Sequence, residues 1–175
     1  MVRWIVILLI ATCVPFGLWL GAQVRQQSRV SDYNDKMICC QHLDYLALWL
    51  EEYAKAHGGK YPPTLMDAVF PGDTLDHAPT YLVCPRGPER CVLGSSVVEI
   101  KSQYTPDHHC SYLYFGGGKT VEEMRGRLII LEKKANHFAG QKRWGVRMGV
   151  SHDQSVTGIP EAEAVELAKN EVRPK

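Results

Sequence analysis

The first hydrophobic pattern in the chain is an uninterrupted apolar run near its start. No charged residue occurs from Trp4 to Ala22, and this length is close to the roughly 20 residues with which a helix crosses a bilayer core. Trp4 and Trp19 lie near the two ends, where indole rings favour the membrane interface. A cleaved signal peptide and a lipoprotein signal at Cys13 fit this run less well than an uncleaved anchor does. We therefore expect a transmembrane helix that stays on the protein.

A second pattern, with apolar residues three or four positions apart, follows from residue 31. It predicts one face of a helix, made of Leu43, Leu46, Leu50 and Tyr53 and extended by Cys39. The polar residues 23–31 between the two patterns include neither Gly nor Pro, so nothing there forces a helix to end. The sequence predicts one long helix whose outer part is amphipathic.

A firm stop signal follows this helix. Gly58 and Gly59 can take the left-handed conformation that closes a helix, and prolines beyond it prevent a restart. Pro62 and Pro63 favour an extended backbone. We expect the segment from Gly58 through Tyr61 to reverse the chain, so that the next residues return along the helix.

The rest of the chain changes to short runs rich in Val, Ile, Leu and Tyr, separated by Gly, Pro and Asp. These runs predict strands within residues 80–85, 91–104, 110–118, 127–134 and 143–151. A proline followed by acidic residues then predicts a short terminal helix beginning near Pro160.

These elements predict an α+β protein of two parts. Residues 1–30 would be the membrane anchor with its polar extension, and residues 31–175 would be the head. In the predicted fold, the N-terminal transmembrane helix continues into a long amphipathic helix packed on an antiparallel β-sheet, with a short C-terminal helix.

Charge and motifs exclude several functions. With 20 basic and 19 acidic residues the net charge is +1, so the chain lacks the basic surface that nucleic-acid binding requires. The Gly-Lys-Thr at residues 118–120 is not a phosphate loop, because Leu113 stands where the first glycine belongs. A cysteine nucleophile at Cys110 would need a base, for which His108, His109 and His137 are the candidates. We predict no enzyme, no cofactor and no nucleic-acid partner.

Five cysteines follow the apolar run: Cys39, Cys40, Cys84, Cys91 and Cys110. In a small anchored domain, such usage favours an oxidising compartment, and we expect at least one disulfide that includes Cys84. Its partner would be Cys91, which closes a proline-rich loop, or one of the two helix cysteines.

The sequence offers two candidate metal sites. A zinc site could combine His108, His109 and Cys110 with Cys84 and Cys91, but the paired short arms of most zinc sites are missing. Asp153 alone offers too few oxygens for calcium. We predict no metal.

One combination of features resembles a known family. The end of the predicted helix carries Tyr53 and is followed by Gly59, Tyr61, Pro62 and Leu65, and then by a predicted sheet. This order resembles the type II secretion pseudopilins. A cysteine in the helix, the Cys-Pro at residues 84–85 and the Asn-His within residues 132–137 resemble a subset of pseudopilin-like proteins. The resemblance implies a pilin-like head in the periplasm and a single-pass anchor in the bacterial inner membrane. It also implies a structural or accessory role in a type II secretion or type IV pilus-like system, with other pseudopilins as partners.

The chain departs from this family at its start. The family leader, a Gly followed by Phe-Thr-Leu-x-Glu, is absent, and the resemblance assigns that Glu to filament assembly. We therefore expect the mature chain to keep Met1 or Val2 and to act as an accessory subunit. The alternative is a free-standing membrane-anchored periplasmic binding domain with a pilin-like head.

Overall fold

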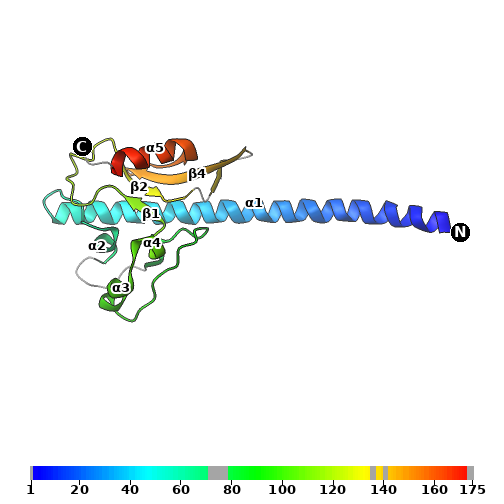
Figure 1. Ribbon diagram of the computed structural model, residues 1–175, viewed down its shortest axis with the longest axis horizontal. Coiled ribbons are helices and arrows are strands. Elements are labelled where there is room, and N and C mark those ends of the chain that lie inside the picture. The colour runs from blue at the N-terminus through cyan, green and yellow to red at the C-terminus, as the bar shows by residue number, and fades with distance from the viewer. Residues whose placement is uncertain (1, 71–78, 135–136, 140–141, 173–175) are drawn as a thin grey trace. The chain divides into compact units, whose positions relative to one another are not determined.

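A long helix, α1 (Val2–Ala56), forms the first third of the chain, and short helices and a sheet follow it (Figure 1). The computed structural model describes residues 2–70, 79–134, 137–139 and 142–172. It divides into two units, Met1–Asn34 and Asp35–Lys175. The first unit is helical, and the second, which we call the head, holds the sheet and the core.

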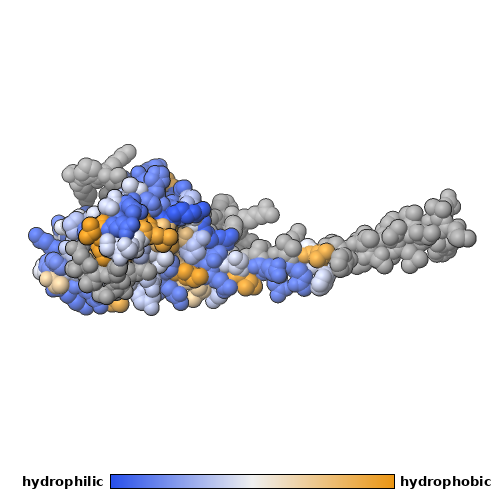
Figure 2. Space-filling view, turned by 90° about the horizontal axis from the view of Figure 1, so that it is seen from below, coloured by the Kyte–Doolittle hydropathy of each residue, from blue (hydrophilic) through white to orange (hydrophobic). Residues whose placement is uncertain are grey.

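The predicted transmembrane anchor is corrected by the structure. Residues 4–22 are helical, but among the described residues no helix is both long and apolar enough to cross a membrane. Gln23, Gln26 and Gln27, which follow the apolar run, are exposed, and hydrophilic side chains lie along this part of the helix (Figure 2). The side chains of residues 4–18 lie outside the described residues. The prediction of a single-pass inner-membrane protein was therefore wrong.

The predicted apolar face of the helix is confirmed in the head. Its members are almost fully buried: Cys39, Leu43, Leu46 and Leu50. Each fully buried Leu contributes about 1.5–3 kcal/mol relative to an exposed one. Tyr53, at the end of the same face, is half-buried. This face forms one hydrophobic core with the sheet and the short helices.

The predicted helix stop is also confirmed. Gly58 and Gly59 have φ values of 65° and 81°, and the Gly59 N–H donates to the Ala54 carbonyl at 2.8 Å. These left-handed residues reverse the chain at little steric cost because glycine has no Cβ. The return is then held by two contacts: the Tyr61 N–H donates to the Lys119 carbonyl at 2.9 Å, and the Tyr114 hydroxyl donates to the Pro62 carbonyl at 2.9 Å.

The returning chain starts a short helix against α1. Helix α2 (Leu65–Val69) is capped at Thr64, whose side chain and backbone exchange hydrogen bonds with Asp67. This is a capping box, which satisfies backbone N–H groups at the start of a helix. Leu65 is buried as predicted, and Pro63 before the cap is exposed.

The strands predicted at 110–118, 127–134 and 143–151 are present. Among the described residues the strands form one five-stranded antiparallel sheet, made of β1 (Tyr112–Tyr114), β2 (Leu128–Glu132), β3 (His137–Ala139), β4 (Lys142–Ser151) and β5 (Val156–Pro160). β1 pairs with β2, and β2, β3 and β5 all pair with β4.

The predicted C-terminal helix, α5 (Glu161–Val172), packs against β4 and β5. The Arg147 guanidinium on β4 donates through Nε to Glu161 at 2.8 Å, and Ala164 is fully buried. Strand β2 is buried along nearly its whole length, and the sheet lies between α1 and α5 in Figure 1. The α+β class, the antiparallel sheet and the terminal helix are therefore confirmed.

Two predicted strands were wrong, because these segments form helices instead. Residues Pro79–Leu82 form the 3₁₀ helix η2, Val97–Gln103 form α3 and Pro106–His109 form α4. The Ser96 hydroxyl accepts from the Glu99 N–H and caps α3. Spacing of three residues between the buried Val97 and Ile100 suits a helix, whereas strand alternation would have required spacing of two.

Candidate buried thiol and carboxylate site

Three potential metal ligands meet inside the head: the thiols of Cys39 and Cys84 and the carboxylate of Glu132. Their relative exposures are 0%, 2% and 0%, and their ligand atoms all lie within 4.8 Å of one another. Cys39 comes from α1, Cys84 from the loop after η2, and Glu132 from the end of β2. The cluster therefore joins three segments that are far apart in sequence.

The Glu132 carboxylate is held from two sides. The Cys39 thiol donates a hydrogen bond to Oε1 at 2.9 Å, and the backbone N–H of Met148 donates to Oε2 at 2.7 Å. Burying a carboxylate is costly unless hydrogen bonds replace those of water. Because a backbone amide of β4 supplies one of them, the sheet itself fixes the position of this side chain.

The surroundings of the Cys39 thiol favour its protonated form. The hydrogen bond with Cys84, burial and the negative charge of Glu132 together raise the pKa of the Cys39 thiol. Tyr112, whose hydroxyl lies 3.4 Å from the Cys39 sulfur, also has a raised pKa, chiefly because it is buried. Since the thiolate is the reactive form of cysteine, Cys39 has the environment of an inert thiol rather than of a nucleophile.

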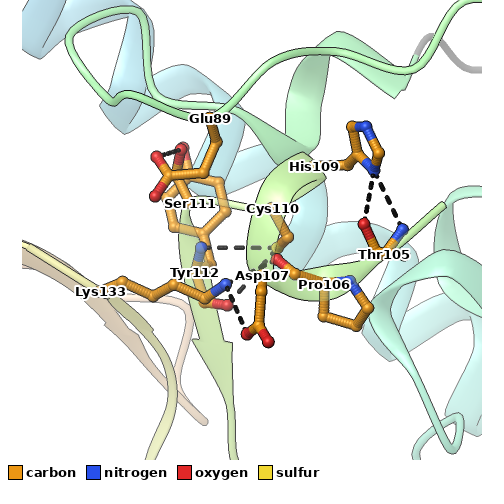
Figure 3. A network of polar contacts seen from close by, with 9 residues as sticks. All are labelled: Glu89, Thr105, Pro106, Asp107, His109, Cys110, Ser111, Tyr112 and Lys133. Atoms are coloured by element: carbon orange, nitrogen blue, oxygen red, sulfur yellow. Dashed lines mark hydrogen bonds and ion pairs between the residues drawn. The ribbon is translucent and has the colours of Figure 1, made fainter.

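Local hydrogen bonds hold Cys84 next to Ser111, the residue before β1. The Cys84 N–H donates to the Ser111 hydroxyl oxygen at 2.8 Å, and the Ser111 N–H donates to the Leu82 carbonyl at 2.8 Å. The Ser111 hydroxyl then donates to a Glu89 oxygen at 2.9 Å (Figure 3). This buried chain of contacts fixes the loop that carries Cys84.

The structure does not bring together the zinc ligands considered from the sequence, which include His109 and Cys110. His109 uses its Nδ1 to accept from the Thr105 N–H at 3.0 Å, and the Cys110 sulfur lies 3.4 Å from the Tyr112 nitrogen (Figure 3). In the part of the chain that the structure describes, the group of three ligands within reach of one ion is the one around Cys39. Asp153 accepts from Ser155 on the surface.

The five cysteines after the apolar run are present as thiols rather than as disulfides in the structure. Among the predicted pairings, the sulfur atoms of Cys39 and Cys84 lie within 4.8 Å of each other. Cys40 and Cys91 are partly buried, and burial raises the pKa of each thiol. The expected disulfide remains a prediction.

Glu132 is the member of the site that the sequence did not single out. It follows an apolar strand run, Leu128–Leu131, and a charged residue at that place usually marks the exposed end of a strand. What places Glu132 in the site is the register of the sheet, which pairs it with Tyr112 on the side of α1. That register depends on tertiary structure.

A histidine supports the same loop from α1. The ring of His42 approaches the Val83 carbonyl through Nδ1 at 3.1 Å and packs edge-on against Tyr81 with ring centres 5.1 Å apart. Tyr81 also contacts Tyr45 and Trp49. Burial lowers the pKa of His42, so the fold favours the neutral ring.

We expect this histidine to make stability depend on pH. Its folded pKa lies below the unfolded value of about 6.5, so the unfolded chain takes up the proton first as the pH falls. The stabilisation is complete above that value and is lost as the pH falls from it toward the folded pKa. Urea unfolding at pH 7.5 and 5.5 should show a smaller pH dependence for His42→Gln than for wild type. Equal dependence would show that the ring titrates alike in both states.

The comparisons with known proteins supply no identity for these features, since no family model, no curated protein and no solved structure matches the chain.

Proposed function

We propose that the chain is a non-enzymatic structural subunit of the pseudopilin type, with an accessory role in assembling a type II secretion or type IV pilus-like system. The order of its elements supports this proposal: a long helix, a glycine reversal and an antiparallel sheet packed on the helix. The raised pKa of the Cys39 thiol, which favours its unreactive protonated form, supports a non-enzymatic role. The observation that carries the proposal is a second apolar face on α1.

This second face, which we call the back face, consists of exposed hydrophobic side chains in the head portion of α1: Met37, Ile38, Tyr45 and Leu48. Their relative exposures are 44%, 40%, 47% and 42%. An α-helix turns about 100° per residue, so Leu48 lies nearly opposite Leu46 and Leu50, which are buried on the core side. The same helix therefore carries one apolar face inside the head and another outside it.

A neighbouring helix is the partner that fits this back face. Apolar residues at these spacings form the ridges that interlock when two helices pack side by side. Exposed groups of large apolar residues mark interaction surfaces more often than scattered ones do. By the same rotation, Gln41 lies among these apolar residues and Asp44 lies beside them; both are exposed and can supply polar contacts. We assign the partner as α1 of another pilin-like subunit, either a second copy or a different chain.

The proposal predicts that charge on the back face will break the assembly. The double variant Met37→Glu/Leu48→Glu should lose its place in the complex, because it would bury two unpaired carboxylates between helices. Native gel electrophoresis of extracts from the host should show wild type in a species larger than the single chain and the variant as a single chain.

The matched control is Leu93→Glu/Val98→Glu. These two side chains are exposed and apolar but lie outside α1, so this variant should migrate like wild type. If both double variants migrate like wild type, the back face is not an assembly surface. Circular dichroism of each variant separates loss of assembly from loss of folding.

A further inference from the structure

We propose that Cys39, Cys84 and Glu132 form a zinc site that links α1, the loop after η2 and β2. This site is independent of the proposed assembly role, because its residues are on the core side of α1, away from the back face. It would make the packing of helix, loop and sheet dependent on a metal ion.

The donor set suits zinc. Zinc binds cysteine thiolate and carboxylate oxygen, and its sites in proteins commonly have four ligands in a tetrahedron. Two thiols and one carboxylate, mutually within 4.8 Å, supply three of these positions. The mixed sulfur and oxygen set is unsuited to magnesium or calcium, which prefer oxygen alone.

The groups around the three ligands form hydrogen bonds of the kind that orient the ligands of a metal site. Hydrogen bonds that orient the ligands raise metal affinity. The Met148 N–H holds Oε2 of Glu132 at 2.7 Å and leaves Oε1 turned toward Cys39 at 2.9 Å. The Tyr112 hydroxyl, 3.4 Å from the Cys39 sulfur, can donate to the thiolate that forms on binding. The Cys84 N–H is anchored by Ser111.

Zinc binding at this site is a proton exchange. Two S–H bonds break, two zinc–sulfur bonds form, and both protons pass to solvent, while the carboxylate binds through Oε1 in place of its hydrogen bond from Cys39. Two thiolates and one carboxylate carry three negative charges, of which the ion neutralises two. Arg147, whose Nη1 lies 3.4 Å from the Glu132 carbonyl oxygen, is the nearby positive group on β4.

A disulfide between Cys39 and Cys84 accounts for the cluster less well. Oxidation would remove the thiol proton that Cys39 now donates to Glu132, and a buried carboxylate would lose that hydrogen bond. A buried polar group that loses its partner keeps the full cost of its desolvation. Zinc removes the same proton but binds the same oxygen, so the carboxylate keeps a partner.

Metal binding to the full chain tests the site. The chain is purified under reducing conditions, stripped with a chelator, checked for folding by circular dichroism and titrated with Co²⁺. Wild type should bind one Co²⁺ with thiolate-to-cobalt charge-transfer absorption and release of two protons, and Zn²⁺ should then displace the Co²⁺ without further proton release. Cys91→Ser, which changes a cysteine outside the cluster, should behave identically. Glu132→Gln should bind roughly tenfold more weakly or worse, and Cys84→Ser should lose the charge-transfer band.

Two results would overturn the proposal. One is a folded, reduced wild-type chain that shows no charge-transfer band with micromolar Co²⁺; this test needs no variant, so it stands even if Cys84→Ser does not fold. The other is a chain isolated from its host with a mass lower by two hydrogens and with the Cys39 and Cys84 peptides joined. That result would assign the pair to a disulfide.

Discussion

Replacing Leu46 with alanine is expected to lower the free energy of unfolding of the chain by about 2–5 kcal/mol. Leu46 is completely buried at the centre of the core face of α1. The change removes apolar contact and leaves a cavity between the helix and the sheet, and rigid neighbours can collapse into such a cavity only in part. Chemical denaturation followed by circular dichroism measures the loss.

Leu48→Ala is the matched control for this prediction. It makes the same chemical change on the same helix two residues away, but Leu48 is 42% exposed. Its effect in the isolated chain should stay near the ±0.5 kcal/mol typical of surface positions. Equal losses for the two variants would contradict the assignment of a core face and a back face.

Glu132→Ala is expected to destabilise the metal-free chain by about 1–3 kcal/mol through lost hydrogen bonds alone. The Met148 N–H and the Cys39 thiol both donate to this carboxylate. Alanine has no side-chain acceptor for either donor. Because Glu132 has no exposed surface, water does not readily replace it. Denaturation in the presence of a chelator measures this effect apart from any bound ion.

The control for this second variant is Glu122→Ala. The Glu122 side chain is 72% exposed and pairs with Arg125 across one helical-type turn. Such surface pairs contribute about 0–1 kcal/mol. If Glu132→Ala matches this control or stabilises the chain, the buried carboxylate is not held as the structure indicates.

The sequence predicted best where a local signal and tertiary packing agree. Leu43, Leu46 and Leu50 repeat at helical spacing, and they form the buried face of α1. Gly58 and Gly59 close that helix because only their backbone tolerates positive φ without strain.

Prediction was poorer where several weak signals competed. Residues 91–104 are rich in valine and were expected to form a strand, yet the Ser96 cap and the helical spacing of Val97 and Ile100 produce α3. The apolar run from Trp4 to Ala22 was read as a membrane anchor from length and lack of charge. In the described part of the chain, no helix combines the length and the apolar character needed to cross a membrane.

The candidate site was only half visible in the sequence. Cys39 and Cys84 stood out as cysteines, but their meeting with Glu132 depends on three segments being packed together. Pairing of Glu132 with Tyr112 turns this carboxylate toward α1. A shift of one residue in that register would point it to the other face of the sheet.

Photo-cross-linking from the back face tests the central claim, assembly through α1, most directly. A photoreactive amino acid is placed at Met37 or Leu48, and for comparison at Val98, which is 72% exposed on α3. Irradiation of intact host cells is followed by mass spectrometry of the joined peptides. The account predicts adducts from Met37 and Leu48 to the α1 helix of another pilin-like subunit, with little product from Val98. Absence of adducts at both α1 positions, or equal yields at all three, would contradict it.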